Sequence, residues 1–247
     1  MDASRLLNPA ESFTEAVRFL AHEFHQHQQR CSDHPRTFIV GLAGAPGSGK
    51  TTLARALASS LSTATESETV VVPMDGYHKY RSELSAMSNS EEAFIKRGIH
   101  WTFAPEKLSR DLEILRSTGF WSAPTFDHAA KDPVEHAIQV TPGSRIVIVE
   151  GIYMAFHGGL PEWEAVQRLL DATIFLSIDL AVSTERLTKR HMAAWGISRE
   201  EAHLRAAGSD LDNARTLVQD VGVHPPSMVL HSASLDEDPA LLQGLLC

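Results

Sequence analysis

The chain has very little cysteine, no long apolar run and no excess of basic charge. Its 247 residues include two cysteines, Cys31 and Cys247. That number is too small for a disulfide framework and is typical of a reducing, intracellular compartment. No apolar stretch approaches the ~20 residues needed to span a bilayer. The N-terminus also lacks the cationic start and apolar core of a signal peptide. We therefore expect a cytoplasmic protein without a membrane partner.

The acidic charge balance argues against nucleic acid as a partner. Lys and Arg number 22 against 31 Asp and Glu, a formal net charge of −9. A chain of that charge presents no general basic field for nucleic acid, so a small polar metabolite is the expected partner. The length fits one α/β domain spanning residues 1–247. The sequence leaves the oligomeric state open, a homodimer included.

One short segment carries a phosphate-binding motif. Residues 44–51 read Gly-Ala-Pro-Gly-Ser-Gly-Lys-Thr and match the pattern G-x-x-x-x-G-K-[ST] in full. The glycines allow successive backbone N–H groups to point at phosphate oxygens. In this pattern Lys50 reaches the β- and γ-phosphates and the Thr51 hydroxyl binds Mg²⁺. The predicted nucleotide-binding residues are Gly44, Ala45, Pro46, Gly47, Ser48, Gly49, Lys50, Thr51 and Thr52.

The surrounding pattern predicts an α/β fold. Apolar, β-branched runs alternate with amphipathic helical patterns along the chain, which favours a mostly parallel sheet with helices on both faces. The five predicted strands are residues 37–43, 69–75, 145–150, 173–178 and 227–231. We expect residues 1–35 to form an N-terminal helical extension whose histidines, His22, His25 and His27, lie on a solvated face. Residues 82–89 and 119–142 show no clear period and are expected to be loops.

Two acidic residues follow predicted strands, and each precedes a glycine. Parallel strands place their carboxyl ends at one edge of the sheet, so Asp75 and Glu150 should meet the triphosphate there. Glu150 is the expected partner of Thr51 in holding Mg²⁺. Asp75 suits a general base that takes the proton from an acceptor hydroxyl. Arg186 and Arg190 share a helical face and suit the charge of a phosphoryl group in transfer.

At this point the chain resembles a known group of enzymes. The sequences Asp75-Gly-Tyr-His78, Glu150-Gly-Ile-Tyr153 and Pro124-Thr-Phe-Asp-His128 look like those of the uridine kinase/phosphoribulokinase/bacterial pantothenate kinase group. The likeness is greatest to its branch of bacterial fructose-transport-system kinases and their fungal relatives. The sequence of residues 96–98 and the element from Arg186 to His191 are shared with this branch. One departure is Ser209, where the related kinases have Asn.

The resemblance implies roles for residues that the motif alone does not assign. Asp75 would orient or deprotonate the acceptor, Thr51 and Glu150 would serve Mg²⁺, and Arg186 and Arg190 would lie on a helical lid at about residues 181–207. The acceptor pocket would be lined by Asp75, Tyr77, His78, Arg97, Phe126, Asp127, His128 and Tyr153. Lys50, Asp75, Arg186 and Arg190 form the predicted catalytic set.

The expected function is an ATP-dependent kinase that phosphorylates a hydroxyl of a small metabolite. A nucleoside is the first choice of acceptor, a fructose-like sugar the second and a pantothenate-like acid the third. Two other classes compete with this interpretation. A GTPase switch would need an Asn-Lys-x-Asp motif, which the sequence lacks. A nucleotide-binding regulator or NTPase without an acceptor remains an alternative, although Lys50, Thr51, Asp75 and Glu150 are all retained.

Overall fold

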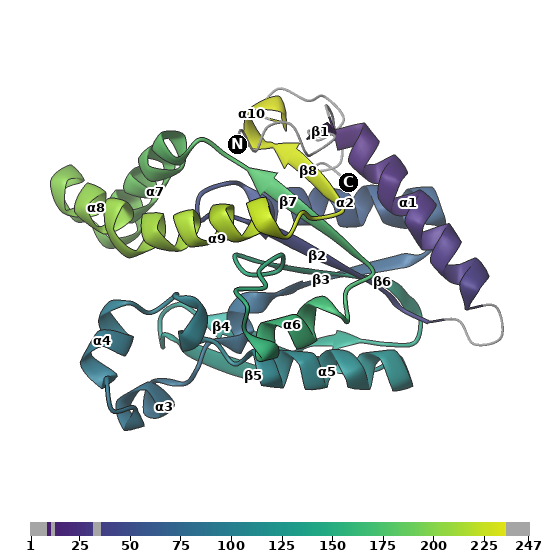
Figure 1. Ribbon diagram of the computed structural model, residues 1–247, viewed down its shortest axis with the longest axis horizontal. Coiled ribbons are helices and arrows are strands. Elements are labelled where there is room, and N and C mark those ends of the chain that lie inside the picture. The colour runs from purple at the N-terminus through teal and green to yellow at the C-terminus, as the bar shows by residue number, and fades with distance from the viewer. Residues whose placement is uncertain (1–8, 11–12, 32–35, 236–247) are drawn as a thin grey trace.

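The computed structural model describes residues 9–10, 13–31 and 36–235. Parts of the expected extension at residues 1–35, together with Cys247, lie outside the described residues. The main sheet is parallel throughout, in the order β1-β8-β7-β2-β6-β3 (Figure 1). Its strands are β1 Pro9–Ala10, β2 Phe38–Gly44, β3 Glu68–Pro73, β6 Ser144–Gly151, β7 Ala172–Ser177 and β8 Met228–His231. The five predicted strands are confirmed, and β1 is a short addition to them.

Helices cover both faces of this sheet because its central strands are apolar on both sides. On β2, Phe38, Val40 and Leu42 pack on one face, with α1 and α2, while Ile39 and Ala43 pack on the other, with α5, α6 and α9. The bounds are α1 Phe13–Arg30, α2 Lys50–Thr65, α5 Pro105–Thr118, α6 Pro161–Gln167 and α9 Leu211–Val223. The α/β P-loop architecture is therefore confirmed. Within the described part of the chain no helix is long and apolar enough to cross a membrane.

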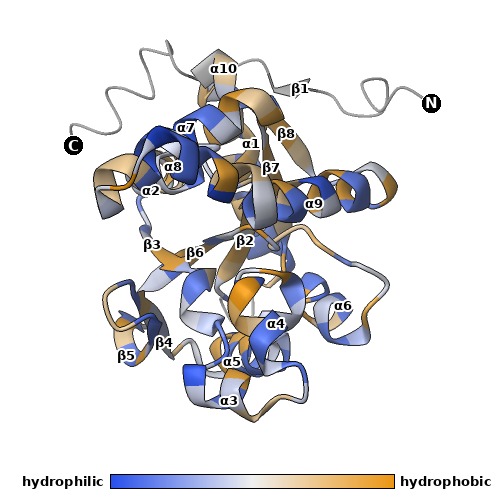
Figure 2. Cartoon of the chain, turned by 90° about the vertical axis from the view of Figure 1, so that its left-hand side faces the viewer, coloured by the Kyte–Doolittle hydropathy of each residue, from blue (hydrophilic) through white to orange (hydrophobic). Residues whose placement is uncertain are grey.

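The carboxyl ends of the strands are flanked by two groups of helices. α7 (Leu180–Trp195) and α8 (Arg199–Arg205) lie on one side, and α3 (Arg81–Ala86) and α4 (Ser90–Ile95) on the other. Figure 2 views this edge, with α7 and α8 above β2, β3 and β6 and with α3 and α4 below them. The chain ends its described part with α10 (Ser232–Leu235).

Two loop predictions were wrong. Residues 119–142 form an antiparallel hairpin of β4 (Trp121–Asp127) and β5 (Asp132–Val140). Its register shifts between Ala123 and Thr125, so the alternation that identifies a strand is interrupted. Residues 82–89, also expected to be a loop, include most of α3. The carboxylate of Glu83 accepts a hydrogen bond of 2.6 Å from the backbone N–H of Tyr80 and so caps the start of this helix.

One histidine differs from its expected surroundings. His22 and His25 are exposed on α1 as expected, but His27 is 6% exposed. Its Nδ1 lies 3.3 Å from the carboxylate of Asp171, which also receives the backbone N–H of Ile39 and the guanidinium of Arg116. His27 therefore ties α1 to the amino-terminal edge of the sheet.

Candidate active site

The phosphate-binding loop connects β2 to α2. Gly47 and Gly49 have φ values of +78° and +93°, the left-handed region that favours glycine. Between them the loop closes a turn in which the N–H of Ser48 donates to the carbonyl of Ala45 over 3.1 Å. Lys50 begins α2, so the loop presents backbone N–H groups at the positive end of a helix dipole. This geometry suits a polyphosphate.

Helix α7 packs directly on the loop. The hydroxyl of Ser183 donates to the carbonyl of Pro46 over 2.6 Å, and Arg186 Nη1 lies 3.4 Å from the carbonyl of Gly47. The structure thus brings Arg186 to the loop. Arg190, four residues further along α7, is exposed.

Ser232 is a residue of this site that the sequence did not single out. It is 4% exposed, and its hydroxyl donates to the carbonyl of Ser48 over 2.9 Å while accepting from Arg186 over 2.9 Å. The end of β8 therefore links the loop to α7. No local motif marks this serine, because its partners lie 46 and 184 residues away in sequence.

Thr51 and Glu150 face each other across the loop. The threonine hydroxyl donates to Glu150 Oε1 over 3.0 Å, and Glu150 is 7% exposed. Burial raises the pKa of Glu150 above its usual range; Asp75 adds to this effect, while the ammonium of Lys50 opposes it. A buried carboxylate and a hydroxyl in contact fit a hard divalent cation whose other ligands are phosphate and water oxygens. The described residues contain no cluster of three or more His, Cys, Asp or Glu side chains that could hold a metal alone.

Asp75 lies in the single 3₁₀ turn Met74–Tyr77 that follows β3. The strand ends are packed closely at this point, and glycine is required for it. A Cβ on Gly151 would lie 2.4 Å from the Cβ of Met74. The glycine after Glu150 therefore lets the turn that carries Asp75 pack against the end of β6.

His78, Phe103 and Phe126 form an aromatic group beside Asp75. The ring centroid of His78 lies 4.0 Å from that of Phe103 and 4.8 Å from that of Phe126. Burial lowers the pKa of His78, an effect that the carboxylate of Asp75 opposes and that Arg97 reinforces. The neutral ring lies with Nδ1 2.9 Å from the carbonyl of Asp75, so Nδ1 carries the proton and Nε2 is left as an acceptor.

Arg97 joins the aromatic group to the hairpin. Its guanidinium donates to the carbonyls of Lys79, over 2.9 Å, and Lys131, and it lies 5.4 Å from the centroid of the Phe126 ring. Asp132 is a further partner at 3.3 Å. Arg97 therefore lies next to Phe126, where the predicted pocket would need it. Two of its hydrogen bonds, however, go to backbone carbonyls of the protein.

Asp127 and His128 lie at the exposed turn of the hairpin. The carboxylate of Asp127 accepts from the N–H groups of Ala129, over 2.7 Å, and Ala130, over 3.1 Å, and these bonds lower its pKa. The ring of His128 lies 5.3 Å from that of Phe126. Of these two predicted pocket residues, Asp127 forms the turn and His128 extends the aromatic group outward.

The two predicted pocket tyrosines are buried in the core. Tyr77 is 1% exposed; its hydroxyl donates to Asp111 on α5 over 2.7 Å and accepts from Trp121 Nε1 over 3.1 Å. Tyr153 is fully buried, and its hydroxyl donates to the carbonyl of Gly98 over 3.1 Å. Burial raises the pKa of both phenols. These contacts give both tyrosines a role in positioning neighbouring segments.

Replacing Tyr77 by Phe tests that role. The change leaves the buried N–H of Trp121 without its acceptor, which typically costs about 1–3 kcal/mol. At roughly 2–4 °C per kcal/mol for a chain of this size, calorimetry should show a clear fall in Tm. The KM of the acceptor should stay unchanged. A raised KM with an unchanged Tm would instead place Tyr77 in the pocket.

Strand, glycine loop, helix and the Thr51–Glu150 pair define a P-loop nucleotide-binding protein. The model of the Phosphoribulokinase / Uridine kinase family matches residues 39–207, and the chain belongs to this family. It is thus an ATP-dependent phosphotransferase by family, and the comparisons confirm the resemblance stated from the sequence.

Individual relatives agree with this assignment. The chain is 35% identical over 219 residues to "Putative uridine kinase C227.14" of Schizosaccharomyces pombe, covering 86% of each chain. It is 36% identical over 155 residues to "ATP-dependent kinase-like protein notR'" of Aspergillus versicolor, covering 59% of this chain and 87% of that protein. Among solved structures, the "putative fructose transport system kinase" of Silicibacter sp. TM1040 superposes with a TM-score of 0.75 at 30% identity, covering 87% of this chain and 98% of that one.

Proposed function

We propose that this protein transfers the γ-phosphate of ATP, with Mg²⁺, to a hydroxyl of a nucleoside. The observation that carries the proposal is the aromatic group of His78, Phe103 and Phe126 immediately beside Asp75. Phe103 is 2% exposed and supports the group from the core, so a flat base would stack on the half-buried Phe126 while its ribose reaches the carboxylate. The name of the fission yeast relative, a putative uridine kinase, supports the same acceptor class.

On the donor side the residues position and neutralise the triphosphate. The loop N–H groups and Lys50 hold the phosphates, and Thr51 with Glu150 would hold the cation, which would supply positive charge to the triphosphate when bound. Arg186 already contacts the loop, so its guanidinium can stabilise the negative charge of the phosphoryl group during transfer. Residues 181–207, with Arg190, would act as a lid that excludes water.

On the acceptor side Asp75 accepts the proton of the attacking hydroxyl. His78 offers Nε2 as a hydrogen-bond acceptor to a donor on the substrate, since its Nδ1 proton is held by the carbonyl of Asp75. Phe126 supplies the stacking face, supported from one side by Arg97. Asp127 and His128, at the turn of the hairpin, would border the pocket.

The test is ADP release in the presence of Mg²⁺-ATP and a panel of nucleosides, sugars and pantothenate. A nucleoside should accelerate ADP release strongly. Phe126→Ala should raise the acceptor KM by roughly 5- to 150-fold, because base stacking is worth about 1–3 kcal/mol, and should leave the KM of ATP unchanged. Phe120→Ala is the matched control, since Phe120 is 57% exposed just before the same hairpin.

Other outcomes would overturn the nucleoside proposal in specific ways. Acceleration by fructose alone would favour the sugar acceptor suggested by the name of the Silicibacter protein. ADP release indifferent to every acceptor would favour an NTPase or a regulator.

A further inference from the structure

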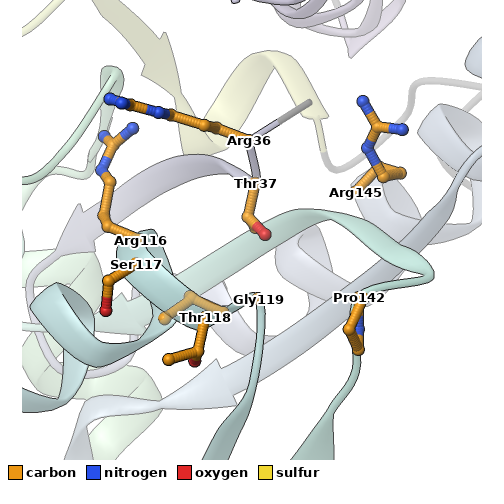
Figure 3. A pocket seen from close by; sticks show the side chains of 9 residues that line it. Arg36, Thr37, Arg116, Ser117, Thr118, Gly119, Pro142 and Arg145 are labelled. Atoms are coloured by element: carbon orange, nitrogen blue, oxygen red, sulfur yellow. The ribbon is translucent and has the colours of Figure 1, made fainter. Parts of the chain in front are cut away.

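A second candidate binding site lies at the opposite edge of the sheet. A cavity of about 320 Å³ opens where β2 and β6 begin and where α5 ends. Figure 3 shows Arg36 and Arg116 on one side of this cavity and Arg145 on the other, with Thr37 between them. The volume is at the lower end of the range for small-molecule pockets, roughly 300–1,000 Å³. It is therefore too large to be explained as the site of one or two waters.

The charge of this cavity differs in sign from that of the chain. Three arginines line it, and none of the described residues that line it carries a carboxylate. The chain as a whole has a net charge of −9. Because the arginines come from three separate segments, their position around one cavity is a property of the fold and not of a local basic run.

Among the residues that the structure describes, two of the three arginines have no anionic partner. Arg116 pairs with Asp171 at 2.8 Å and donates to the carbonyl of Leu169, so its charge is compensated. Arg145 donates to the neutral amide of Gln28, and its Nε is buried without a partner among the residues described. Arg36 is exposed and forms no ion pair within the described ranges. Burying an unpaired guanidinium N–H is costly, and an anion would relieve that cost.

Hydroxyl groups complete the lining. Ser117 Oγ and Thr118 Oγ1 both donate to the carbonyl of Ile114, over 3.0 and 2.7 Å, and Thr118 Oγ1 also accepts from the backbone N–H of Phe120 over 3.1 Å. A hydroxyl that already donates can still accept, through two lone pairs on Ser117 and the one that remains on Thr118, so these two groups favour ligands that carry O–H donors. Thr37, 6% exposed, adds a third hydroxyl next to the arginines.

From these contacts we infer that the cavity binds a phosphate monoester of a small polyol, at a site separate from the phosphate-binding loop. Arg36 and Arg145 bind the phosphoryl dianion, and Ser117, Thr118 and Thr37 accept hydrogen bonds from the polyol. Thr37 directly precedes β2, whose other end is the loop, and Arg145 is on β6, whose other end carries Glu150. Seven strand residues separate the two ends of β2 by roughly 23 Å.

Calorimetric titration tests the inference while the loop is filled with Mg²⁺ and a non-hydrolysable ATP analogue. Ribose 5-phosphate, as the probe, should bind with a stoichiometry of one. The double variant Arg36→Gln/Arg145→Gln should weaken this binding by roughly 10- to 150-fold or more, since hydrogen bonds to charged groups are worth about 1.5–3 kcal/mol. Arg110→Gln, at an exposed arginine on the same α5, is the matched control and should bind normally.

Titration with inorganic phosphate tests whether the cavity binds a phosphate monoester or free phosphate. It should bind more weakly than ribose 5-phosphate, because it makes no use of the hydroxyls. Equal affinities would overturn the monoester assignment, and no heat of binding from ribose 5-phosphate would overturn the site. Basal ADP release and Tm of the double variant should match those of the wild type. Its weaker binding of ribose 5-phosphate would then not be caused by unfolding.

Discussion

Asp75→Asn is expected to lower kcat for acceptor phosphorylation by about 10²- to 10⁴-fold, the usual contribution of a positioned general base. Asparagine keeps the shape of the side chain but has no capacity to take the proton. The KM of ATP should change little, because the loop and the Thr51–Glu150 pair remain intact. The measurement is steady-state ADP release with the acceptor found in the panel, together with equilibrium binding of an ATP analogue.

The control for this experiment is Asp212→Asn. Asp212 has a side chain that is 72% exposed, on α9, so its loss should leave kcat unchanged. The Asp75 variant should also lower the pKa of Glu150, since the carboxylate of Asp75 now contributes to raising it. A kcat for Asp75→Asn close to that of the wild type would remove Asp75 from the role of base and leave it as an orienting residue.

Those parts of the site that depend on local sequence could be predicted. The phosphate-binding loop is contiguous, and its glycine positions follow from the backbone that a phosphate needs. The positions of Asp75 and Glu150 followed from a rule about parallel strands, since β3 and β6 are neighbours and end at the same edge. The electrostatic effects of Lys50 and Asp75 on the pKa of Glu150 agree with that rule, since they place the three side chains at one edge of the sheet.

The parts that were missed depend on contacts between distant segments. Ser232 follows β8 in a polar stretch, and only the pairing of β8 with β7 brings it to Ser48 and Arg186. His27 follows the polar pattern of its helix but is buried because Asp171 lies opposite it. Tyr77 directly follows Gly76 in a candidate motif, yet its hydroxyl is used by Asp111 and Trp121. Sequence position indicates proximity to a site more reliably than it indicates side-chain direction.

The hairpin β4–β5 shows how such a missed element can control the site. β4 packs against the turn that carries Asp75, and the contact is closest at Gly76. A Cβ at this glycine would lie 2.4 Å from the carbonyl oxygen of Pro124 and 2.6 Å from its carbonyl carbon. Both atoms are backbone, so the clash cannot be relieved by a side-chain rotation. Either the hairpin or the turn must move.

Gly76→Ala is therefore expected to destabilise the protein by about 1–3 kcal/mol or more, the usual cost of overpacking. At roughly 2–4 °C per kcal/mol the fall in Tm is easily measured by calorimetry. Because the displaced elements carry Asp75 on one side and Phe126 on the other, kcat should fall and the acceptor KM should rise together. The KM of ATP should change least, since the loop is attached to β2 and α2.

The matched control is Gly222→Ala, which adds the same methyl group in α9. A Cβ there meets no atom within 4 Å, and the position is helical, so alanine should stabilise the protein by roughly 0.4–1 kcal/mol. Opposite signs for the two variants would show that the packing of the hairpin against the Asp75 turn, and not the loss of glycine as such, sets the effect. An unchanged Tm and kcat for Gly76→Ala would mean that the hairpin shifts freely, and the acceptor side would then not depend on the contact between the hairpin and the Asp75 turn.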